Sequence, residues 1–248
     1  MTVAVLEVQG LTKRYPSFLL DGVSFSLEEG RIMGLIGRNG AGKTTTLKSL
    51  FHLVHPDGGK VRVFGMDMPE REREIKPRVG YAGGAVDFYS RKPLREILAV
   101  TKRFYPNWDD AACRRYLDAF SLDETKTPQQ LSEGMRVKCS LTLAMSHRAE
   151  LLILDEPTSG LDPVSRAELL DVLLFLKEKG VSILFSTHIT TDLEKCADDI
   201  TYIAGGKVIA SQPLSSFMAE NAAAGRGRTL EEIMVNCEKE SLYEKLAD

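Results

Sequence analysis

The feature that most constrains this 248-residue chain is the stretch GRNGAGKTT at 37–45, which directly follows the apolar run RIMGLI. It fits the pattern G-x-x-x-x-G-K-[ST] through Gly37, Gly42, Lys43 and Thr44. Glycines let backbone N–H groups turn inward around phosphate oxygens, and the N-terminus of a following helix adds positive potential. Chance would produce this pattern in about 1% of chains of this length, given average residue usage. The stretch therefore predicts a phosphate-binding loop between a buried strand and a helix.

Two side chains of this loop have expected roles toward a nucleoside triphosphate. Lys43 should reach the β- and γ-phosphates, and the Thr44 hydroxyl should bind Mg²⁺. The alternative, a glycine-rich turn without function, is disfavoured by the strand before the loop and the helix after it. The candidate phosphate-binding residues are Gly37, Arg38, Asn39, Gly40, Ala41, Gly42, Lys43, Thr44 and Thr45.

A second stretch, LLILDEP at 151–157, supplies two carboxylates. Its four apolar residues predict a buried strand, and Asp155 follows at the C-terminal end, where parallel sheets bind ligands. We expect Asp155 to hold Mg²⁺, directly or through water. Glu156 can orient or deprotonate an attacking water and is the candidate catalytic base. A solvated helix start is the alternative for this pair, but Pro157 and the preceding strand disfavour it.

Short apolar runs that alternate with helical patterns predict an α/β fold. Runs rich in Val, Ile and Leu, which we expect to be strands, lie at 3–8, 31–36, 61–64, 151–154, 181–185 and 200–203. Helical patterns follow three of them, at 42–51, 163–178 and 189–197. This order favours a mostly parallel sheet. The first strands, around VLEVQG and GVSFSLEEG, alternate more and favour an antiparallel β flank.

The middle of the chain differs from the rest, because strand signals fade there and two helical segments, PLREILAVTKRFY and DDAACRRYLDAF, dominate. Pro106 should end the first helix and Asp109 should cap the second. In the tail, apolar residues at helical spacing predict a packed terminal helix; they are Leu230, Ile233, Met234 and Cys237. We therefore expect three parts. Residues 1–85 and 149–215 should form a P-loop NTPase core, residues 86–148 an inserted α-helical lobe, and residues 216–248 a helical tail.

Composition and charge disfavour several other classes. Lys and Arg total 32 against 35 Asp and Glu, and no block of basic residues occurs, so no nucleic-acid partner is expected. No apolar run approaches the ~20 residues that span a bilayer, so any membrane crossing is expected from another chain. The four Cys have neither CxxC nor metal-ligand spacing, and we expect buried thiols in a reducing compartment.

Further motifs narrow the class. LSEGM (131–135) precedes LLILDEP by about twenty residues, SGLD (159–162) follows it, and STH lies at 186–188. An aromatic residue, Tyr15, precedes the phosphate loop in LTKRYPSF. Together these motifs resemble the ATP-binding subunits of ABC transporters, over residues 3–212. The ending STHITTDLEKCADDITYIAGGKVI is similar to bacterial export systems of the ABC-2 type, whose membrane subunits are separate chains.

The resemblance implies an ATPase that uses ATP and Mg²⁺ and works as a head-to-tail pair, homo- or heterodimeric. Two ATP molecules would lie between the cassettes, each between the phosphate loop of one and the signature helix, here LSEGM, of the other. The further partners would be polytopic membrane permease subunits. The chain would be cytoplasmic and peripheral at the inner face of the cell membrane, and export is favoured over import.

Single residues take roles from the same resemblance. Tyr15 matches the ATP-binding residue that stacks on adenine, with a core aromatic as the alternative. His188 matches the switch histidine that contacts the γ-phosphate and joins Glu156 as a catalytic residue. Asp162 matches a loop that crosses the dimer interface, and it could equally cap the helix that begins at Pro163.

Two positions depart from the family pattern. After VGYAG the family usually has Gln, where this chain has Gly84, which can bend but cannot ligate Mg²⁺ through a side chain. Asp87 could substitute for it. In LSEGM, Ser132 can still donate to a phosphate oxygen and Gly134 still lets the backbone approach. Glu133 can point to solvent while its backbone still donates; turned toward ATP, it would weaken closure by ~1 kcal/mol.

Two other functions compete with ATP-driven export. A nucleotide-gated interaction module with slow turnover is favoured by Gly84 and opposed by Glu156 and His188. A soluble cassette protein acting on ribosomes or DNA usually carries two cassettes or a long coiled-coil insertion, whereas this chain has one cassette and no such insertion.

Overall fold

A mostly parallel sheet forms the centre of the protein. The structure is a computed structural model that describes residues 4–83 and 89–247. In the described residues this sheet has six strands, in the order β10 (Lys207–Pro213), β9 (Asp199–Ala204), β3 (Ile32–Ile36), β8 (Ser182–Thr187), β7 (Leu151–Asp155) and β6 (Val79–Gly83). Among these six described strands, only β10 pairs antiparallel, with β9. The predicted α/β fold with a mostly parallel sheet is confirmed.

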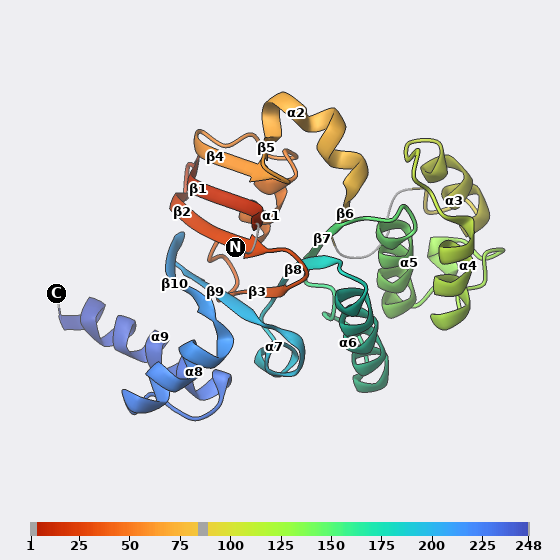
Figure 1. Ribbon diagram of the computed structural model, residues 1–248. Helices are drawn as coiled ribbons and strands as arrows, with labels where there is room; N and C mark the ends of the chain where they lie inside the picture. The colour runs from red at the N-terminus through yellow and green to blue at the C-terminus, as the bar shows by residue number, and fades with distance from the viewer. Residues whose placement is uncertain (1–3, 84–88, 248) are drawn as a thin grey trace.

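A second, antiparallel sheet packs beside the first (Figure 1). Its order in the described residues is β2 (Phe18–Glu28), β1 (Ala4–Tyr15), β4 (Gly58–Val63) and β5 (Met66–Asp67). Along β2, the buried side chains of Val23, Phe25 and Leu27 alternate with exposed ones, as expected for a strand with one face on the core. This is the predicted antiparallel flank.

Helices follow the central strands where the sequence patterns predict them. They are α1 (Lys43–Leu50) after β3, α6 (Pro163–Glu178) after β7 and α7 (Thr190–Cys196) after β8. Both faces of β3 are buried: Ile32 and Ile36 belong to one apolar cluster, and Met33 and Leu35 belong to the other. Leu193 of α7 packs directly on β3. A Cβ at Gly34 would lie only 2.2 Å from its side chain, so any other residue there would have to displace it. Burial on both faces explains why these strands read as continuous apolar runs.

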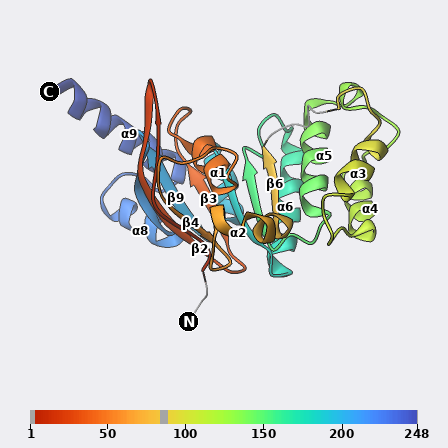
Figure 2. The same ribbon diagram turned by 90° about the horizontal axis from the view of Figure 1, so that it is seen from above.

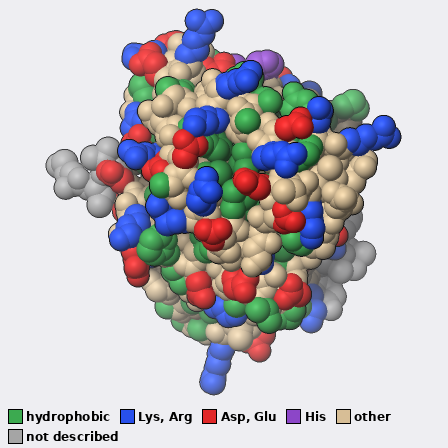
Figure 3. All heavy atoms as spheres, turned by 90° about the vertical axis from the view of Figure 1, so that its right-hand side faces the viewer, with side chains coloured by type: hydrophobic (Ala, Val, Ile, Leu, Met, Phe, Trp, Pro, Cys, Tyr) green, Lys and Arg blue, Asp and Glu red, His purple; other side chains and the backbone are tan. Residues whose placement is uncertain are grey.

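Three helices gather at one end of the molecule (Figures 1 and 2). They are α3 (Leu94–Lys102), α4 (Asp110–Ala119) and α5 (Glu133–Met145), with the short 3₁₀ turn Pro128–Gln130 before α5. The Asp109 carboxylate accepts a hydrogen bond from the Ala112 N–H at 2.9 Å, which is the predicted helix cap. On the surface at this end, Lys, Arg, Asp and Glu side chains are interspersed with hydrophobic ones (Figure 3).

The tail packs as two helices, α8 (Leu214–Ala223) and α9 (Leu230–Ala247), on the opposite side from α3–α5 (Figure 1). Leu230 and Ile233 are fully buried in the core, and Met234 and Cys237 pack against it, as their spacing predicts. The remaining elements are the kinked helix α2 (Met68–Ile75) and the 3₁₀ turn Lys76–Arg78. Among the helices of the described chain, none is long and apolar enough to cross a bilayer.

Candidate functional site: a nucleotide pocket

The phosphate loop lies between β3 and α1, as predicted, and its glycines have conformational reasons to be there. Gly40 and Gly42 adopt φ values of 82° and 111°, which residues other than glycine rarely adopt. A Cβ at Gly37 would lie 2.2 Å from the Ile203 carbonyl oxygen of β9. The loop therefore needs glycine both for its turns and for its close approach to the neighbouring strand.

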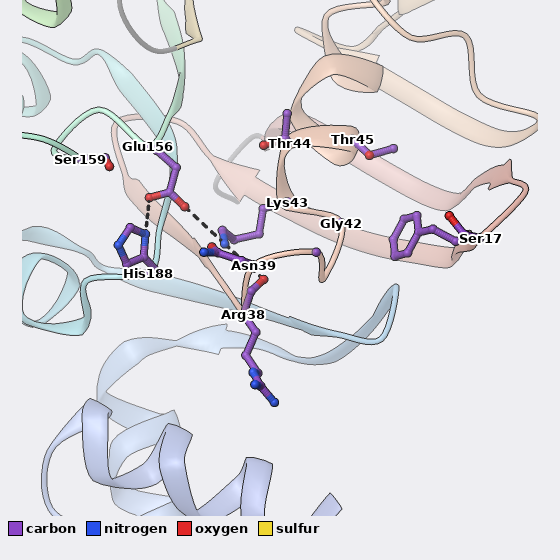
Figure 4. A pocket seen from close by; sticks show the side chains of 12 residues that line it. Ser17, Arg38, Asn39, Gly42, Lys43, Thr44, Thr45, Glu156, Ser159 and His188 are labelled. Carbon is purple, nitrogen blue, oxygen red and sulfur yellow. Dashed lines mark hydrogen bonds and ion pairs between the residues drawn. The ribbon is translucent and has the colours of Figure 1, made fainter. Parts of the chain in front are cut away.

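A pocket of about 590 Å³ opens over this loop (Figure 4). It is lined by Ser17, Phe18, Arg38, Asn39, Gly40, Gly42, Lys43, Thr44, Thr45, Glu156, Ser159 and His188. The structure thus brings most of the predicted phosphate-loop residues together with both predicted catalytic side chains. These come from three separate stretches of the chain, which join because β3, β7 and β8 are neighbours in the sheet.

Lys43 is the buried cation of the pocket, with 6% of its side chain exposed. Its ammonium group donates a hydrogen bond to the Gly37 carbonyl at 2.8 Å and lies 3.3 Å from Oε1 of Glu156. A buried ammonium group needs such partners, because losing water without compensation is costly. The ammonium group of Lys43, which the sequence predicts to reach the β- and γ-phosphates, is therefore bound to these two groups here.

Glu156 connects Lys43 to His188. Its other carboxylate oxygen, Oε2, lies 2.7 Å from Nδ1 of His188 (Figure 4). A carboxylate can only accept, so this contact places the ring proton on Nδ1. Glu156 also has φ of 52°, a backbone conformation that costs a non-glycine residue energy and clusters at functional sites. The surrounding structure must hold this residue in place.

Asp155 lies under the loop, with 8% of the residue exposed. Its Oδ1 accepts hydrogen bonds from the Thr44 hydroxyl at 3.1 Å and from the Ser186 hydroxyl at 2.6 Å. The two predicted metal-binding side chains, Thr44 and Asp155, are therefore in direct contact. Burial, and then the Asp155 charge, raise the pKa of Tyr81 to about 12, so the nearby phenol stays protonated at neutral pH.

Tyr15, Gly37 and Ala41 do not line this pocket in the described structure, although all three are predicted to bind ATP. Tyr15 is 38% exposed, and its ring centroid lies 6.5 Å from that of Phe18, which does line the pocket. Ala41 is buried, and its carbonyl accepts the Gly206 N–H at 3.2 Å, so it supports the loop from behind. The Arg38 guanidinium is 3.5 Å from Glu238 of α9.

The signature segment forms a second, separate hollow of about 340 Å³. It is lined by Ser132, Glu133, Gly134, Met135, Lys138, Gly160, Asp162 and Ser165. The Ser132 hydroxyl accepts the Met135 N–H at 3.2 Å and so caps α5. Within one chain, the predicted signature residues thus lie apart from those around the phosphate loop.

Glu133 is exposed, but its side chain lies against the 159–162 loop. A Cβ at Gly160 would be 3.2 Å from the Glu133 carboxylate, and one at Gly134 would be 3.1 Å from Leu161. Asp162 caps α6 by accepting from the N–H groups of Val164 and Ser165, at 3.0 and 3.1 Å. The capping alternative for Asp162 therefore holds. Gly84 and Asp87 lie outside the described residues.

Sequence reasoning did not identify Ser17, Phe18 and Ser159, which line the pocket, or Ser186, which contacts Asp155. Phe18 follows Tyr15 by three residues, and its ring packs on the loop, since a Cβ at Gly42 would lie 2.9 Å from Cζ of Phe18. An aromatic so near Tyr15 was a usable signal. Ser186 contacts Asp155 across neighbouring strands, a contact that only strand pairing brings about.

This fold and pocket define a P-loop nucleoside triphosphatase. A family model described as "ABC transporter" matches residues 20–159. A Nod factor export ATP-binding protein I of Burkholderia orbicola (strain AU 1054) is 36% identical over 218 residues, covering 85% of this chain and 71% of that protein. A bacitracin transport ATP-binding protein of Bacillus licheniformis is 32% identical over 221 residues, 88% of this chain and 72% of that protein.

Solved structures agree with these matches. The structure of an ATP-binding subunit of an ABC transporter superposes with a TM-score of 0.83 at 30% identity, covering 93% of this chain and 98% of that one. The chain therefore belongs to the ABC transporter family, as an ATP-binding subunit with ATPase activity, and the predicted family resemblance is confirmed.

Proposed function

We propose that this chain hydrolyses ATP to drive export through separate membrane subunits, as one half of a head-to-tail pair. One relative, a Nod factor export protein, supports the direction of transport by its name, and a second, a bacitracin transport protein, supports transport as such. The observation that carries the proposal is the position of Glu156, whose carboxylate lies at the phosphate loop between Lys43 and His188.

Lys43 would bind phosphate by exchanging partners. Its ammonium group contacts the Gly37 carbonyl and the Glu156 carboxylate, whereas a triphosphate offers several charged oxygens at the same place. Once Lys43 turns to phosphate, Oε1 of Glu156 is released from its cation and can accept a hydrogen bond from water. Glu156 would then take a proton from the attacking water, while His188 keeps hold of its other oxygen.

Thr44 and Asp155 have the donor chemistry that Mg²⁺ requires. Both offer oxygen, the ligand type that Mg²⁺ prefers, and their side-chain oxygens are 3.1 Å apart. In the proposed site, the Thr44 hydroxyl would ligate the ion and Asp155 would bind it directly or through water. The ion would supply neutralisation of charge on the phosphates. The adenine would lie towards Tyr15 and Phe18.

The second hollow would serve the ATP of a partner cassette. There Ser132, Gly134 and the N-terminus of α5 would donate to phosphate oxygens, and the loop ending at Asp162 would cross the interface. Residues 1–85 and 149–215 would act as the ATPase core, 86–148 as the signature lobe and 216–248 as a tail. If the partner is a different cassette, the effect of Glu133 falls on the partner's site, because Glu156 and His188 serve this chain's own ATP.

The partners would be a second ATP-binding subunit and polytopic membrane permeases at the inner face of the cell membrane. Copurification from detergent-solubilised membranes tests this part of the proposal. Recovery of a polytopic membrane protein with the chain is expected. Recovery with ribosomes instead would contradict it.

The Glu156→Gln substitution tests the catalytic part. It keeps the shape of the side chain but removes the base, so ATP hydrolysis should fall by ~10²–10⁴-fold while ATP binding is retained. Scattering in solution should then detect a dimer when the variant is saturated with Mg-ATP. Glu178→Gln, on the exposed end of α6, is the matched control and should hydrolyse ATP like the unaltered chain. Equal activity in both variants would exclude Glu156 as the base.

A further inference from the structure

Ser186 has two hydrogen bonds that converge on the proposed catalytic residues. It lies near the C-terminal end of β8, two residues before His188, and is fully buried. Its hydroxyl donates to Oδ1 of Asp155 at 2.6 Å and accepts the backbone N–H of Glu156 at 3.0 Å. One hydroxyl group thus contacts both members of the carboxylate pair.

The bond to Asp155 restricts which carboxylate oxygen remains for a metal. Oδ1 also accepts from the Thr44 hydroxyl, so both side-chain hydrogen bonds described for Asp155 end on the same oxygen. Hydrogen bonds from a hydroxyl to an ionised carboxylate are short and strong, and this one is sheltered from water. Ser186 therefore fixes the rotation of the carboxylate and leaves Oδ2 for a metal ion or its water.

The bond to Glu156 supports a strained backbone. With φ of 52°, Glu156 has a conformation that persists only where its surroundings hold it. Its N–H is shared between the hydroxyl and the carbonyl oxygen of Ser186, at 3.0 and 3.2 Å. Ser186 and Asp155 are also directly paired residues of β8 and β7. The strand that carries His188 is thereby tied to the turn that carries Glu156.

We propose that Ser186 is a positioning residue, which orients Asp155 toward the metal and holds the backbone of Glu156 relative to His188. The inference rests on the proposed roles of Asp155 and Glu156. It predicts that removing the hydroxyl affects metal binding and turnover while leaving metal-free nucleotide binding almost unchanged, since Ser186 does not line the pocket.

The test compares Ser186→Ala with Ser182→Ala in the full chain. Ser182 lies at the other end of the same strand, is 1% exposed, and accepts the Gly30 N–H at 2.9 Å. Both variants lose one buried hydroxyl, so both should lower the unfolding temperature. Mn²⁺ binding, followed by electron paramagnetic resonance with ADP present, should weaken by ~10-fold or more only in Ser186→Ala, the size typical of outer-shell ligand partners. The kcat for ATP should fall by a similar factor, with KM within about twofold.

Two further variants keep the outcome decisive. Ser186→Thr retains the hydroxyl and should restore Mn²⁺ affinity to within about threefold, whereas Ser186→Cys, a poor donor, should not. This pair carries the test if Ser186→Ala does not fold. Asp155→Asn separates the two levels of inference. If it leaves Mn²⁺ affinity unchanged, the proposed metal site is wrong. If it abolishes binding while Ser186→Ala and Ser186→Cys behave like Ser182→Ala, the role of Ser186 is overturned.

Discussion

Alanine at Gly42 and alanine at Gly40 should differ in a way that the phosphate-loop geometry determines. Both glycines have positive φ, 111° and 82°, so both substitutions impose backbone strain of ~1–3 kcal/mol. A Cβ at Gly40 would meet nothing within 4 Å. A Cβ at Gly42 would lie 2.8 Å from Leu20 and 2.9 Å from Phe18. Gly40→Ala is therefore a control for strain without crowding.

The crowding at Gly42 adds to the strain. Leu20 is fully buried, so it cannot move away freely, and overpacking of this kind costs ~1–3 kcal/mol. For a chain of this size, each kcal/mol lowers the unfolding temperature by about 2–4 °C. Gly42→Ala should therefore unfold ~2–12 °C below Gly40→Ala, the range that the overpacking cost and the shift per kcal/mol together give.

Thermal unfolding of the nucleotide-free chain, followed by circular dichroism, measures this difference. The affinity for a fluorescent ATP analogue should fall further in Gly42→Ala as well, because displacing Phe18 changes the wall of the pocket. An unfolding temperature for Gly42→Ala equal to or above that of Gly40→Ala would refute the packing of β2 on the phosphate loop.

Three other predictions concern Phe18, Glu133 and the buried thiols. Phe18→Ala should weaken ATP binding by ~5–100-fold, the size of one lost base-stacking contact, and Tyr15→Ala should weaken it less; the reverse order in titrations would restore Tyr15 as the adenine platform. In a Glu156→Gln background, Glu133→Gly should lower the ATP concentration for half-maximal dimerisation by ~5-fold at low salt. An unchanged concentration would show that the Glu133 charge does not weaken closure around ATP. Burial raises the pKa of the Cys139 and Cys196 thiols to about 12, above the unfolded value near 9.0. Because the folded state holds these protons more tightly, the free energy of unfolding should decrease as pH rises from about 9 towards 12. Alkylation of both thiols, followed by mass spectrometry, should track global unfolding. Rapid labelling of either thiol in the folded chain at pH 8 would contradict their burial.

Elements that lack a continuous apolar run or a regular apolar spacing were the ones that the sequence did not reveal. Strand β10 alternates exposed and half-buried residues, so it has no apolar run. Helix α2, MPEREREI, is mostly charged and is kinked at Arg71, so its apolar spacing is poor. Strand β6 is short and contains two glycines, and it lies between its partner strand β7 and helix α5, since a Cβ at Gly80 would be 2.3 Å from the Ala144 carbonyl oxygen. Of these, β6 depends on a partner strand that is distant in sequence, whereas β10 pairs with β9, the strand just before it.

The sequence by itself determined the phosphate loop, the acidic pair at the end of β7, the family and the α/β class. These signals are local: a glycine turn, a cation and a hydroxyl must follow one another directly, and a buried strand shows its apolar run in consecutive residues. Only the tertiary structure decided that Glu156 lies between Lys43 and His188, that Phe18 covers Gly42, that Glu133 rests on Gly160, and that Ser186 holds Asp155. These contacts join residues from separate strands and loops, and strand order in a sheet is set by packing over the whole core, which no short stretch of sequence records.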